Sequence, residues 1–268
     1  MTAATDKVTL HALQQIKREG RKIVAVGVYD FQMAAIVDRS GVDVVSVGDS
    51  VGPTMWGLGS EHAVTLEQML LACGGVRRGV TRALVSCDFP GRVLDEGIDA
   101  VIRAARRLLE EGGADVVKID GLAESPEVVR ALANEGIPVW AQFGRQPDLV
   151  GMKAESTNNQ QTAGEVEHWV AIAKRLEGAG AVMLNFIHSG PIAGAAVAQA
   201  VSIPVLGGLG GGPWLDGRVR VIGNAIGYLA RALDDEVERY ANVARITFDA
   251  ITAYADDVRG GRQIKGDP

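Results

Sequence analysis

The chain has 268 residues, of which 47% are hydrophobic and 22% charged, and its formal net charge is −6. This length suits one large domain or two small ones, and the composition is that of an ordinary globular protein. The acidic balance and the lack of a basic run argue against a nucleic-acid-binding surface. Two cysteines, Cys73 and Cys87, exclude a disulfide framework and favour a reducing cytoplasm.

The sequence gives no sign of a targeting or membrane segment. Its first ten residues, MTAATDKVTL, lack a basic stretch followed by an apolar one, so we expect no signal peptide. No apolar run approaches the roughly 18 residues that would span a bilayer. We therefore expect neither a membrane nor a nucleic acid as a partner.

Short apolar runs alternate along the chain with longer amphipathic segments. Residues 7–19 predict a helix that covers the bottom of a barrel. Eight apolar runs predict strands over 22–30, 42–49, 83–90, 115–121, 137–144, 181–187, 203–210 and 218–223. Apolar residues spaced by three and four predict helices between them, over 65–80, 95–113, 125–136 and 164–180. Residues 234–258 predict a long C-terminal helix, whose apolar stripe is expected to pack on another element or another subunit.

The fold class follows from this alternation. Strands that are apolar without a period of two are typical of a parallel sheet buried on both faces. Eight repeats of strand and helix predict an α/β protein with a (β/α)8 TIM barrel. We expect a single domain over 1–268, with the barrel at about 20–233. A doubly wound open sheet is the alternative, which the eight strands and the lack of a glycine-rich dinucleotide turn after the first strand disfavour.

Polar residues stand where the predicted strands end, and in such barrels this is the end that carries the active site. Two of them, Lys118 and Asp120, are two residues apart and therefore face the same way. In chain order these residues are Asp49, Ser50, Asp88, Lys118, Asp120, Gln142, Asn185 and His188.

Three carboxylates at neighbouring strand ends repel one another unless a cation lies between them. Oxygen ligands alone favour a hard divalent ion, most simply Mg²⁺, and no Cys and His cluster suggests zinc. Taken singly, each residue has a structural alternative: Asp49 as a helix cap, Asp88 in a turn, and Lys118 with Asp120 as a solvated pair. Their joint position at equivalent strand ends favours a site.

The glycine-rich stretch GGLGGG, 207–212, follows the seventh predicted strand. Its backbone N–H groups could cradle an anion, or it could be a tight turn. It lacks the Gly-Lys-Ser/Thr ending of a P-loop. The sequence leaves both readings open.

These residues also carry a family resemblance. The stretches VYDFQMAAIVDRSGVDVVSVGDSVG, VTLEQMLLACGGVRRGV, ALVSCDFP, VVKIDG and IPVLGGLGGGPWLDGRV together resemble ketopantoate hydroxymethyltransferases. The resemblance runs from about residue 7 to about residue 230, and its most specific parts are VSVGDS and the DG after the glycine-rich loop. That family belongs to the phosphoenolpyruvate mutase and isocitrate lyase group of Mg²⁺-dependent (β/α)8 barrels.

The resemblance implies an activity and a set of residues. Such enzymes transfer a one-carbon unit from 5,10-methylenetetrahydrofolate to C3 of a 2-oxo acid. By resemblance, Asp49, Asp88 and Asp120 would bind the metal, and Ser50 and Lys118 would hold the substrate carboxylate. A metal that chelates the 2-oxo acid would act as a Lewis acid and stabilise its enolate.

Three positions depart from the family pattern. The third metal ligand is Asp120 where the family has Glu, so its reach is shorter by about 1.5 Å, one C–C bond. Gln142 replaces a His of the fifth strand. Asn185 stands where the family has its catalytic base, a Glu, and an amide does not accept a proton near neutral pH.

Three explanations for Asn185 remain. Another base could serve, for which His188 and Glu155 are the candidates, against the alternatives of a backbone-bonded loop histidine and a solvated loop acid. The reaction could instead cleave a C–C bond without needing that base. The chain could also have lost activity.

We therefore predict a hydroxymethyltransferase-like enzyme with an altered 2-oxo acid substrate. The alternatives are a lyase or decarboxylase of the same superfamily and a non-catalytic metal-binding homologue. We expect a cytoplasmic homo-oligomer. The residues assigned to the site are Asp49, Asp88 and Asp120 for metal; Ser50, Asp49, Asp88, Lys118 and Gln142 for substrate; and Lys118, His188, Glu155 and Asn185 for catalysis.

Overall fold

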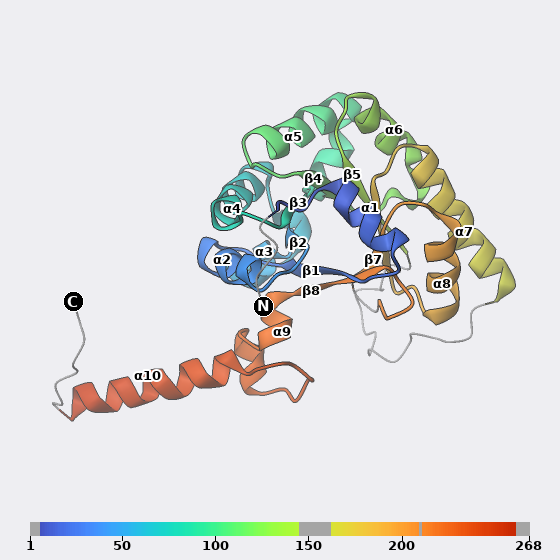
Figure 1. Ribbon diagram of the computed structural model, residues 1–268. Coiled ribbons are helices and arrows are strands. Elements are labelled where there is room, and N and C mark those ends of the chain that lie inside the picture. Colours follow the sequence, from blue (N-terminus) through green and yellow to red (C-terminus); the bar gives the residue numbers. More distant parts are fainter. Residues whose placement is uncertain (1–5, 145–161, 209–210, 261–268) are drawn as a thin grey trace. The chain divides into compact units, whose positions relative to one another are not determined.

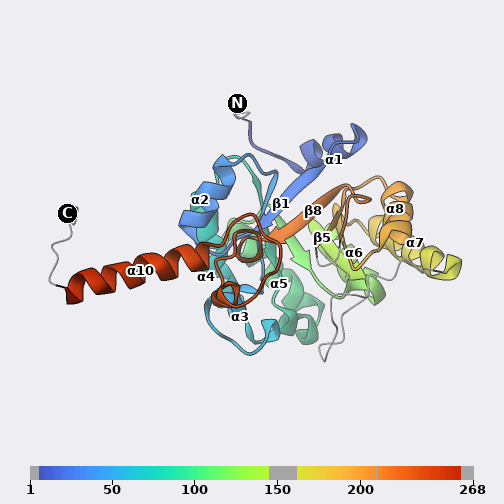
Figure 2. The ribbon, with the colours of Figure 1, turned by 90° about the horizontal axis from the view of Figure 1, so that it is seen from below.

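The computed structural model describes residues 6–144, 162–208 and 211–260. It contains a closed barrel of eight strands in the order of the sequence (Figures 1 and 2), so the predicted fold class is confirmed. The pairs from β1–β2 to β7–β8 are parallel. The strands are β1 (Ile23–Gly27), β2 (Val44–Val47), β3 (Leu84–Asp88), β4 (Val116–Ile119), β5 (Val139–Gly144), β6 (Met183–Ile187), β7 (Val205–Gly207) and β8 (Gly217–Val221).

Helices follow β1 to β6 and surround the barrel, as the repeat predicts, whereas no helix separates β7 from β8 among the described residues. Three of the four amphipathic segments predicted between strands contain α4, α5 and α6, and the fourth, 164–180, misses only the first residue of α7. No helix in the described part of the chain is long and apolar enough to cross a membrane. The helices of the first 220 residues are α1 (Leu10–Arg18), α2 (Phe31–Arg39), α3 (Val51–Met55), α4 (Leu66–Gly79), α5 (Ile98–Glu110), α6 (Pro126–Asn134), α7 (Ala163–Gly178) and α8 (Pro191–Ala200), with short 3₁₀ helices η1 (Glu61–Ala63), η2 (Gly91–Glu96) and η3 (Leu122–Glu124).

The chain divides into two compact units, residues 1–220 and 221–268. The second contains α9 (Ile222–Ile226), the 3₁₀ helix η4 (Ala230–Leu233) and α10 (Val243–Arg259). The expectation of a single domain over 1–268 stays a prediction, since each unit is described by itself.

The C-terminal helix begins nine residues later than the predicted start at residue 234, so that boundary was wrong. The cause is competition for the backbone and side chains of 234–242. The Tyr240 N–H donates to the Ala225 carbonyl, and the Asn242 amide donates to that of Ala232. The Asn242 side-chain oxygen then accepts from the Arg245 N–H at 3.0 Å, which is the contact expected of a helix N-cap.

The lower half of the barrel interior is apolar. The first inward residue of most strands joins α1 in one buried cluster, so this helix covers the bottom of the barrel as predicted. The cluster contains Val8, Leu13, Ile16, Ile23, Ala25, Val44, Leu84, Val116, Trp140, Met183 and Leu206.

The interior becomes polar one layer higher. Side chains of a strand alternate in direction, so residues two positions further along return to the interior. On β2 to β6 these residues are all polar and buried: Ser46, Ser86, Lys118, Gln142 and Asn185. The change from apolar to polar marks the end of the barrel that carries the candidate site.

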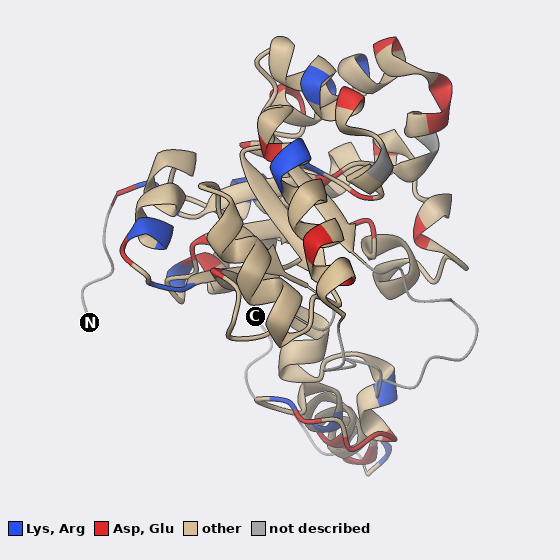
Figure 3. Ribbon diagram, turned by 90° about the vertical axis from the view of Figure 1, so that its right-hand side faces the viewer, with Lys and Arg blue, Asp and Glu red and all other residues tan. Residues whose placement is uncertain are grey.

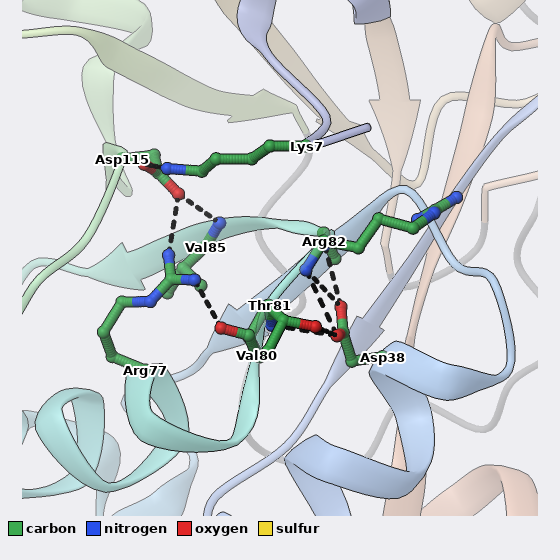
Figure 4. Close-up of polar contacts among 9 residues, drawn as sticks. Lys7, Asp38, Arg77, Val80, Thr81, Arg82, Val85 and Asp115 are labelled. Carbon is green, nitrogen blue, oxygen red and sulfur yellow. Dashed lines mark hydrogen bonds and ion pairs between the residues drawn. The ribbon is translucent and has the colours of Figure 1, made fainter. Parts of the chain in front are cut away.

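Ion pairs and hydrogen bonds fasten the N-terminal ends of β3 and β4 (Figure 4). The Asp38 carboxylate at the end of α2 accepts hydrogen bonds from the backbone N–H groups of Thr81, Arg82 and Ala83 and from the Thr81 hydroxyl. The Asp115 carboxylate accepts from the Val85 N–H and also pairs with Lys7 and Arg77. These contacts fix the entry to β3 and β4.

Charged residues fall mainly on the helices and loops of the described part of the chain, with acidic and basic positions interspersed (Figure 3).

Removal of the Asp38 carboxylate should destabilise the barrel. Burial opposes its charge, but the donors of 81–83 outweigh burial and hold its pKa below the usual value of 3.8. We expect Asp38→Ala to lower the free energy of unfolding by about 2–4 kcal/mol near neutral pH, because the donors lose their acceptor. Urea denaturation measures this, with the exposed Glu110→Ala as the control.

The pH dependence has a fixed sign. A carboxylate with a lowered pKa stabilises the fold above the unfolded value of about 3.8 and loses that effect at lower pH. The difference between wild type and Asp38→Ala should therefore shrink below pH 4. An equal stability of the two proteins at pH 7 would contradict this account of Asp38.

Candidate active site

The candidate site lies where β2, β3 and β4 end. Asp88 is the last residue of β3 and is the register partner of Lys118 on β4. Asp120 follows β4, and Asp49 lies two residues after β2. The structure therefore brings together the strand ends from which the sequence predicted a site.

Gly48 shapes the turn that carries Asp49. A Cβ atom at this position would lie 2.8 Å from the Ser50 hydroxyl oxygen. Contacts below about 3.0 Å are not tolerated without movement, so a side chain here would displace Ser50. The glycine of the VGDS stretch thus lets Asp49 and Ser50 turn over the end of the strand.

Lys118 is the centre of the charged cluster. Its ammonium group lies 2.8 Å from Asp88 Oδ2 and 3.1 Å from Asp120 Oδ1. The Lys118 side chain is only 8% exposed. Burial alone would lower its pKa, but the carboxylates of Asp120, Asp88 and Asp49 outweigh burial and raise the pKa of Lys118. The lysine is therefore a fixed cation at neutral pH.

Only one of the two carboxylate oxygens of Asp88 has a hydrogen-bond partner among the described residues. Its Oδ2 accepts from Lys118, whereas its buried Oδ1 has no hydrogen-bond partner among the described residues. Burial raises the pKa of Asp88 to about 6, even though the Lys118 ammonium opposes the shift. A buried, unpartnered carboxylate oxygen is costly, and such groups mark places where a ligand or ion completes the site.

The ionised form of Asp49 is more strongly disfavoured than that of Asp88. Burial raises the pKa of Asp49 to about 8, with repulsion from Asp88 as the next cause. Two carboxylates thus share the neighbourhood of one lysine and disfavour each other's ionisation. The arrangement would be relieved by a further positive charge.

The Asp49, Asp88 and Asp120 set is not a preformed metal cage. In the described residues, no group of three His, Cys, Asp or Glu side chains is close enough to hold a metal ion. Lys118 binds one oxygen of Asp88 and one of Asp120, which leaves Asp49 and the second oxygens of Asp88 and Asp120 as the acceptors not bound to the lysine. The donor chemistry fits a hard cation, and the assignment of these three residues to a metal stays a prediction.

Tyr29 belongs to the same region and was missed from the sequence. Its hydroxyl lies 2.7 Å from the Ser50 hydroxyl, two residues beyond the end of β1. Burial raises the pKa of Tyr29, so it stays protonated. The sequence did contain a signal for Tyr29: it is a polar residue just beyond the end of the first strand. The same kind of position on the other strands predicted the charged residues of the site.

Two serines lie one layer below the charges and were also missed. The Ser86 hydroxyl donates to the Ser46 hydroxyl at 2.7 Å inside the barrel. Both residues are buried and both stand one pleat before the strand ends of the site. Ser46 and Ser86 each stand two residues after a buried apolar residue, Val44 and Leu84, and this spacing was the signal in the sequence that they face the barrel interior.

Gln142 and Asn185 form the opposite side of the polar layer. They are register partners on β5 and β6, and both are buried. The Asn185 amide nitrogen donates to Gln142 Oε1 at 2.5 Å, and the Gly208 N–H donates to Asn185 Oδ1 at 2.9 Å. The glycine-rich stretch is thus tied to β6 through its second residue.

Of the two candidate bases, only His188 lies among the described residues. His188 directly follows β6 and has a left-handed φ of 48°, so it occupies a tight turn before α8. Glu155 lies outside the described residues. Both assignments as a base stay predictions.

Neutralising Asp49 should relieve the electrostatic conflict. A carboxyl whose pKa rises from 3.8 to about 8 on folding weakens the fold as pH increases between these values. We expect Asp49→Asn to raise the Tm of the EDTA-treated protein at pH 8.5, by about 2–4 °C per kcal/mol of penalty removed, and to change it little at pH 4. Thermal denaturation at both pH values tests this, with Glu110→Gln as the control; a wild-type pH dependence in Asp49→Asn would refute it.

Known structures share the fold at low sequence identity. A 2,3-dimethylmalate lyase, described as a member of the PEP mutase/isocitrate lyase superfamily, aligns with a TM-score of 0.60 and 17% identity, over 97% of this chain and 89% of the other. A phosphonopyruvate hydrolase in complex with oxalate and Mg²⁺ aligns with a TM-score of 0.60 and 13% identity, over 94% and 88%. At these identities the likeness shows the fold alone.

Comparison with protein sequences gives matches at higher identity. The chain is 36% identical over 261 residues to a 3-methyl-2-oxobutanoate hydroxymethyltransferase of Hyperthermus butylicus, covering 97% of this chain and 89% of the relative. It is 34% identical over 258 residues to that of Prosthecochloris aestuarii, covering 95% and 93%. The sequence model of the ketopantoate hydroxymethyltransferase family matches residues 7–263. The resemblance seen in the sequence is therefore confirmed, and the chain belongs to the ketopantoate hydroxymethyltransferase family.

Proposed function

We propose that this protein transfers a hydroxymethyl unit to the enolate of a 2-oxo acid, with Mg²⁺ as its metal and 5,10-methylenetetrahydrofolate as the donor. The observation that carries the proposal is the charged cluster at the strand ends. There a fixed Lys118 cation adjoins carboxylates with raised pKa values and an oxygen of Asp88 that has no partner. The family relationship supports the reaction class.

The residues of the chain divide the work. Asp49, Asp88 and Asp120 would hold the metal, whose charge stabilises an enolate when it is bound. Lys118 and Ser50 hold and orient the substrate carboxylate, and Tyr29 fixes the Ser50 hydroxyl through their hydrogen bond. Positioning of the two reactants in the barrel mouth contributes much of the rate.

The proton at C3 needs an acceptor other than Asn185. An amide has no useful basicity near neutral pH, and Asn185 is already bound to Gln142 and Gly208. We assign the base to His188 or to Glu155. The two amides at 142 and 185 also lead us to propose a 2-oxo acid other than the usual branched substrate of the family.

A second candidate is cleavage of a C–C bond in a 2-oxo or 2-hydroxy acid, as a lyase or decarboxylase. The amide at position 185 favours it, because such cleavage generates the enolate without removing a proton from C3. A non-catalytic homologue that binds metal is the third candidate and predicts binding without turnover.

Dependence on folate separates transfer from cleavage. We expect 2-oxo acids to gain one carbon when the protein, Mg²⁺ and 5,10-methylenetetrahydrofolate are all present, with a loss of at least about 10²-fold in Asp49→Ala. Mass spectrometry of the products from a panel of 2-oxo and 2-hydroxy acids measures this. Glu110→Gln is the matched control on an exposed carboxylate.

Product formed without folate would favour the lyase candidate over the transferase. The absence of any product from a folded protein that binds Mg²⁺ would favour the non-catalytic homologue.

We also propose that the protein is a cytoplasmic homo-oligomer that acts on a small-molecule 2-oxo acid. Both cysteines are free and buried, which suits a reducing compartment. Within the second unit, Phe248 and Ile251 of α10 are exposed on an apolar stripe that includes Ala244 and Ala255. The stripe has spacings of four, three and four residues, which suit packing against another helix.

The oligomer can be tested on α10 directly. Size-exclusion chromatography with light scattering should give a multiple of 28.2 kDa for the wild type. We expect Phe248→Glu with Ile251→Glu to reduce that mass, because both charges fall on the apolar stripe. Thr252→Glu, on the charged side of the helix, should leave it unchanged; a monomeric wild type would contradict the proposal.

A further inference from the structure

We propose that Gly208, Asn185 and Gln142 form an oriented amide relay, which presents the Gln142 side-chain NH₂ group to an anionic oxygen of the substrate. Gln142 would then be a substrate-binding residue and Asn185 a positioning residue. The inference rests on the proposed function, since it assigns a ligand to the same barrel mouth.

The direction of the relay is set by the backbone. The Gly208 N–H lies 2.9 Å from the side chain of Asn185, and a backbone N–H can only donate. The oxygen of the Asn185 amide must therefore face Gly208. This removes the usual ambiguity between the oxygen and nitrogen of an asparagine side chain.

The second bond follows from the first. With its oxygen toward Gly208, Asn185 turns its NH₂ group to Gln142, whose Oε1 accepts at 2.5 Å. The oxygen of Gln142 is then occupied, and its Nε2 donates to none of the described residues. The outer end of the relay is thus a donor, and the relay contains no group that titrates near neutral pH.

The surroundings hold this direction. Asn185 and Gln142 are 2% and 7% exposed and are register partners on adjacent strands. A rotation of either amide would place two like groups against each other in a buried layer, at a cost of about 1–3 kcal/mol for each unsatisfied group. The relay is therefore preorganised before a ligand arrives.

A donor needs an acceptor, and a preorganised one is best used on a developing negative charge. The oxygens of a 2-oxo acid and of its enolate are such acceptors. Gln142 therefore supplies a hydrogen bond to a substrate oxygen, in addition to the Lys118 ammonium on β4. This assigns the polar residues of β5 and β6 to the substrate oxygens rather than to the C3 proton.

The relay makes a sharp prediction for Asn185→Asp. A carboxylate still accepts from the Gly208 N–H, but it cannot donate to Gln142. Gln142 should then reverse, so that its NH₂ group binds the new carboxylate and its oxygen faces the ligand. Anion binding should weaken although Gln142 itself is unchanged.

Oxalate is the probe, because it is a planar dianion that resembles the enolate of a 2-oxo acid. Isothermal titration of oxalate into the full-length protein with Mg²⁺ gives its Kd. We expect Gln142→Met and Asn185→Asp each to raise Kd by about 10–100-fold, as for loss of a hydrogen bond to a charged group. The double variant should be no worse than either single one, because Asn185 acts through Gln142.

Gln142→Glu is the second test of direction. Its side chain can still accept from the Asn185 amide, but it offers an oxygen in place of the NH₂ group and should raise Kd at least as much as Gln142→Met. Thermal unfolding establishes that each variant is folded, and Glu110→Gln should bind oxalate as the wild type does.

The outcomes are distinct. If the wild type binds oxalate with Mg²⁺ and the variants at 142 and 185 bind it equally well, the relay is refuted and the proposed function stands. Additive losses in the double variant would also refute it, because Asn185 would then act independently of Gln142. If the wild type does not bind oxalate with Mg²⁺, the proposed function and the relay fail together.

Discussion

One constraint governs the site: a buried lysine shared among carboxylates that outnumber it. Lys118 forms ion pairs with Asp88 and Asp120, and the carboxylate of Asp49 also raises the pKa of Lys118. Burial weakens the screening of these charges, so the conflict between Asp49 and Asp88 is not relieved by solvent. The cluster therefore favours an additional cation, such as a bound metal, and this is the physical basis of the proposed chemistry.

The barrel keeps this conflict at one end and its stabilising contacts at the other. Asp38 and Asp115 bind backbone N–H groups at the start of β3, and an apolar layer with α1 fills the bottom. The unfavourable charges lie two pleats further along the same strands. This separation of stability and function along the barrel axis is general for the fold.

The strand ends were readable from the sequence because position along a parallel strand fixes position in the barrel. The pair Lys118 and Asp120, two residues apart, predicted a shared direction, and the structure joins them by an ion pair. The same rule would have found Tyr29, Ser46 and Ser86, whose hydroxyl groups are polar interruptions of apolar runs.

Other features could not be read from the sequence. The relay from Gly208 to Gln142 joins three strands or loops that are far apart in the chain, so it exists only after the barrel closes. The start of α10 depends on hydrogen bonds from Tyr240 and Asn242 to residues before the helix, and helical periodicity does not detect these. Both the relay and the start of α10 depend on hydrogen bonds between elements that are separate in the sequence.

Asn185 makes the fate of the C3 proton the central question. Proton NMR of 2-oxoisovalerate and smaller 2-oxo acids in D₂O, with protein and Mg²⁺, follows that proton directly. The account predicts exchange that requires Mg²⁺ and is lost in Asp49→Ala. No exchange on any 2-oxo acid, with the protein folded and Mg²⁺ bound, would contradict enolate formation by proton removal and leave C–C cleavage or an inactive homologue.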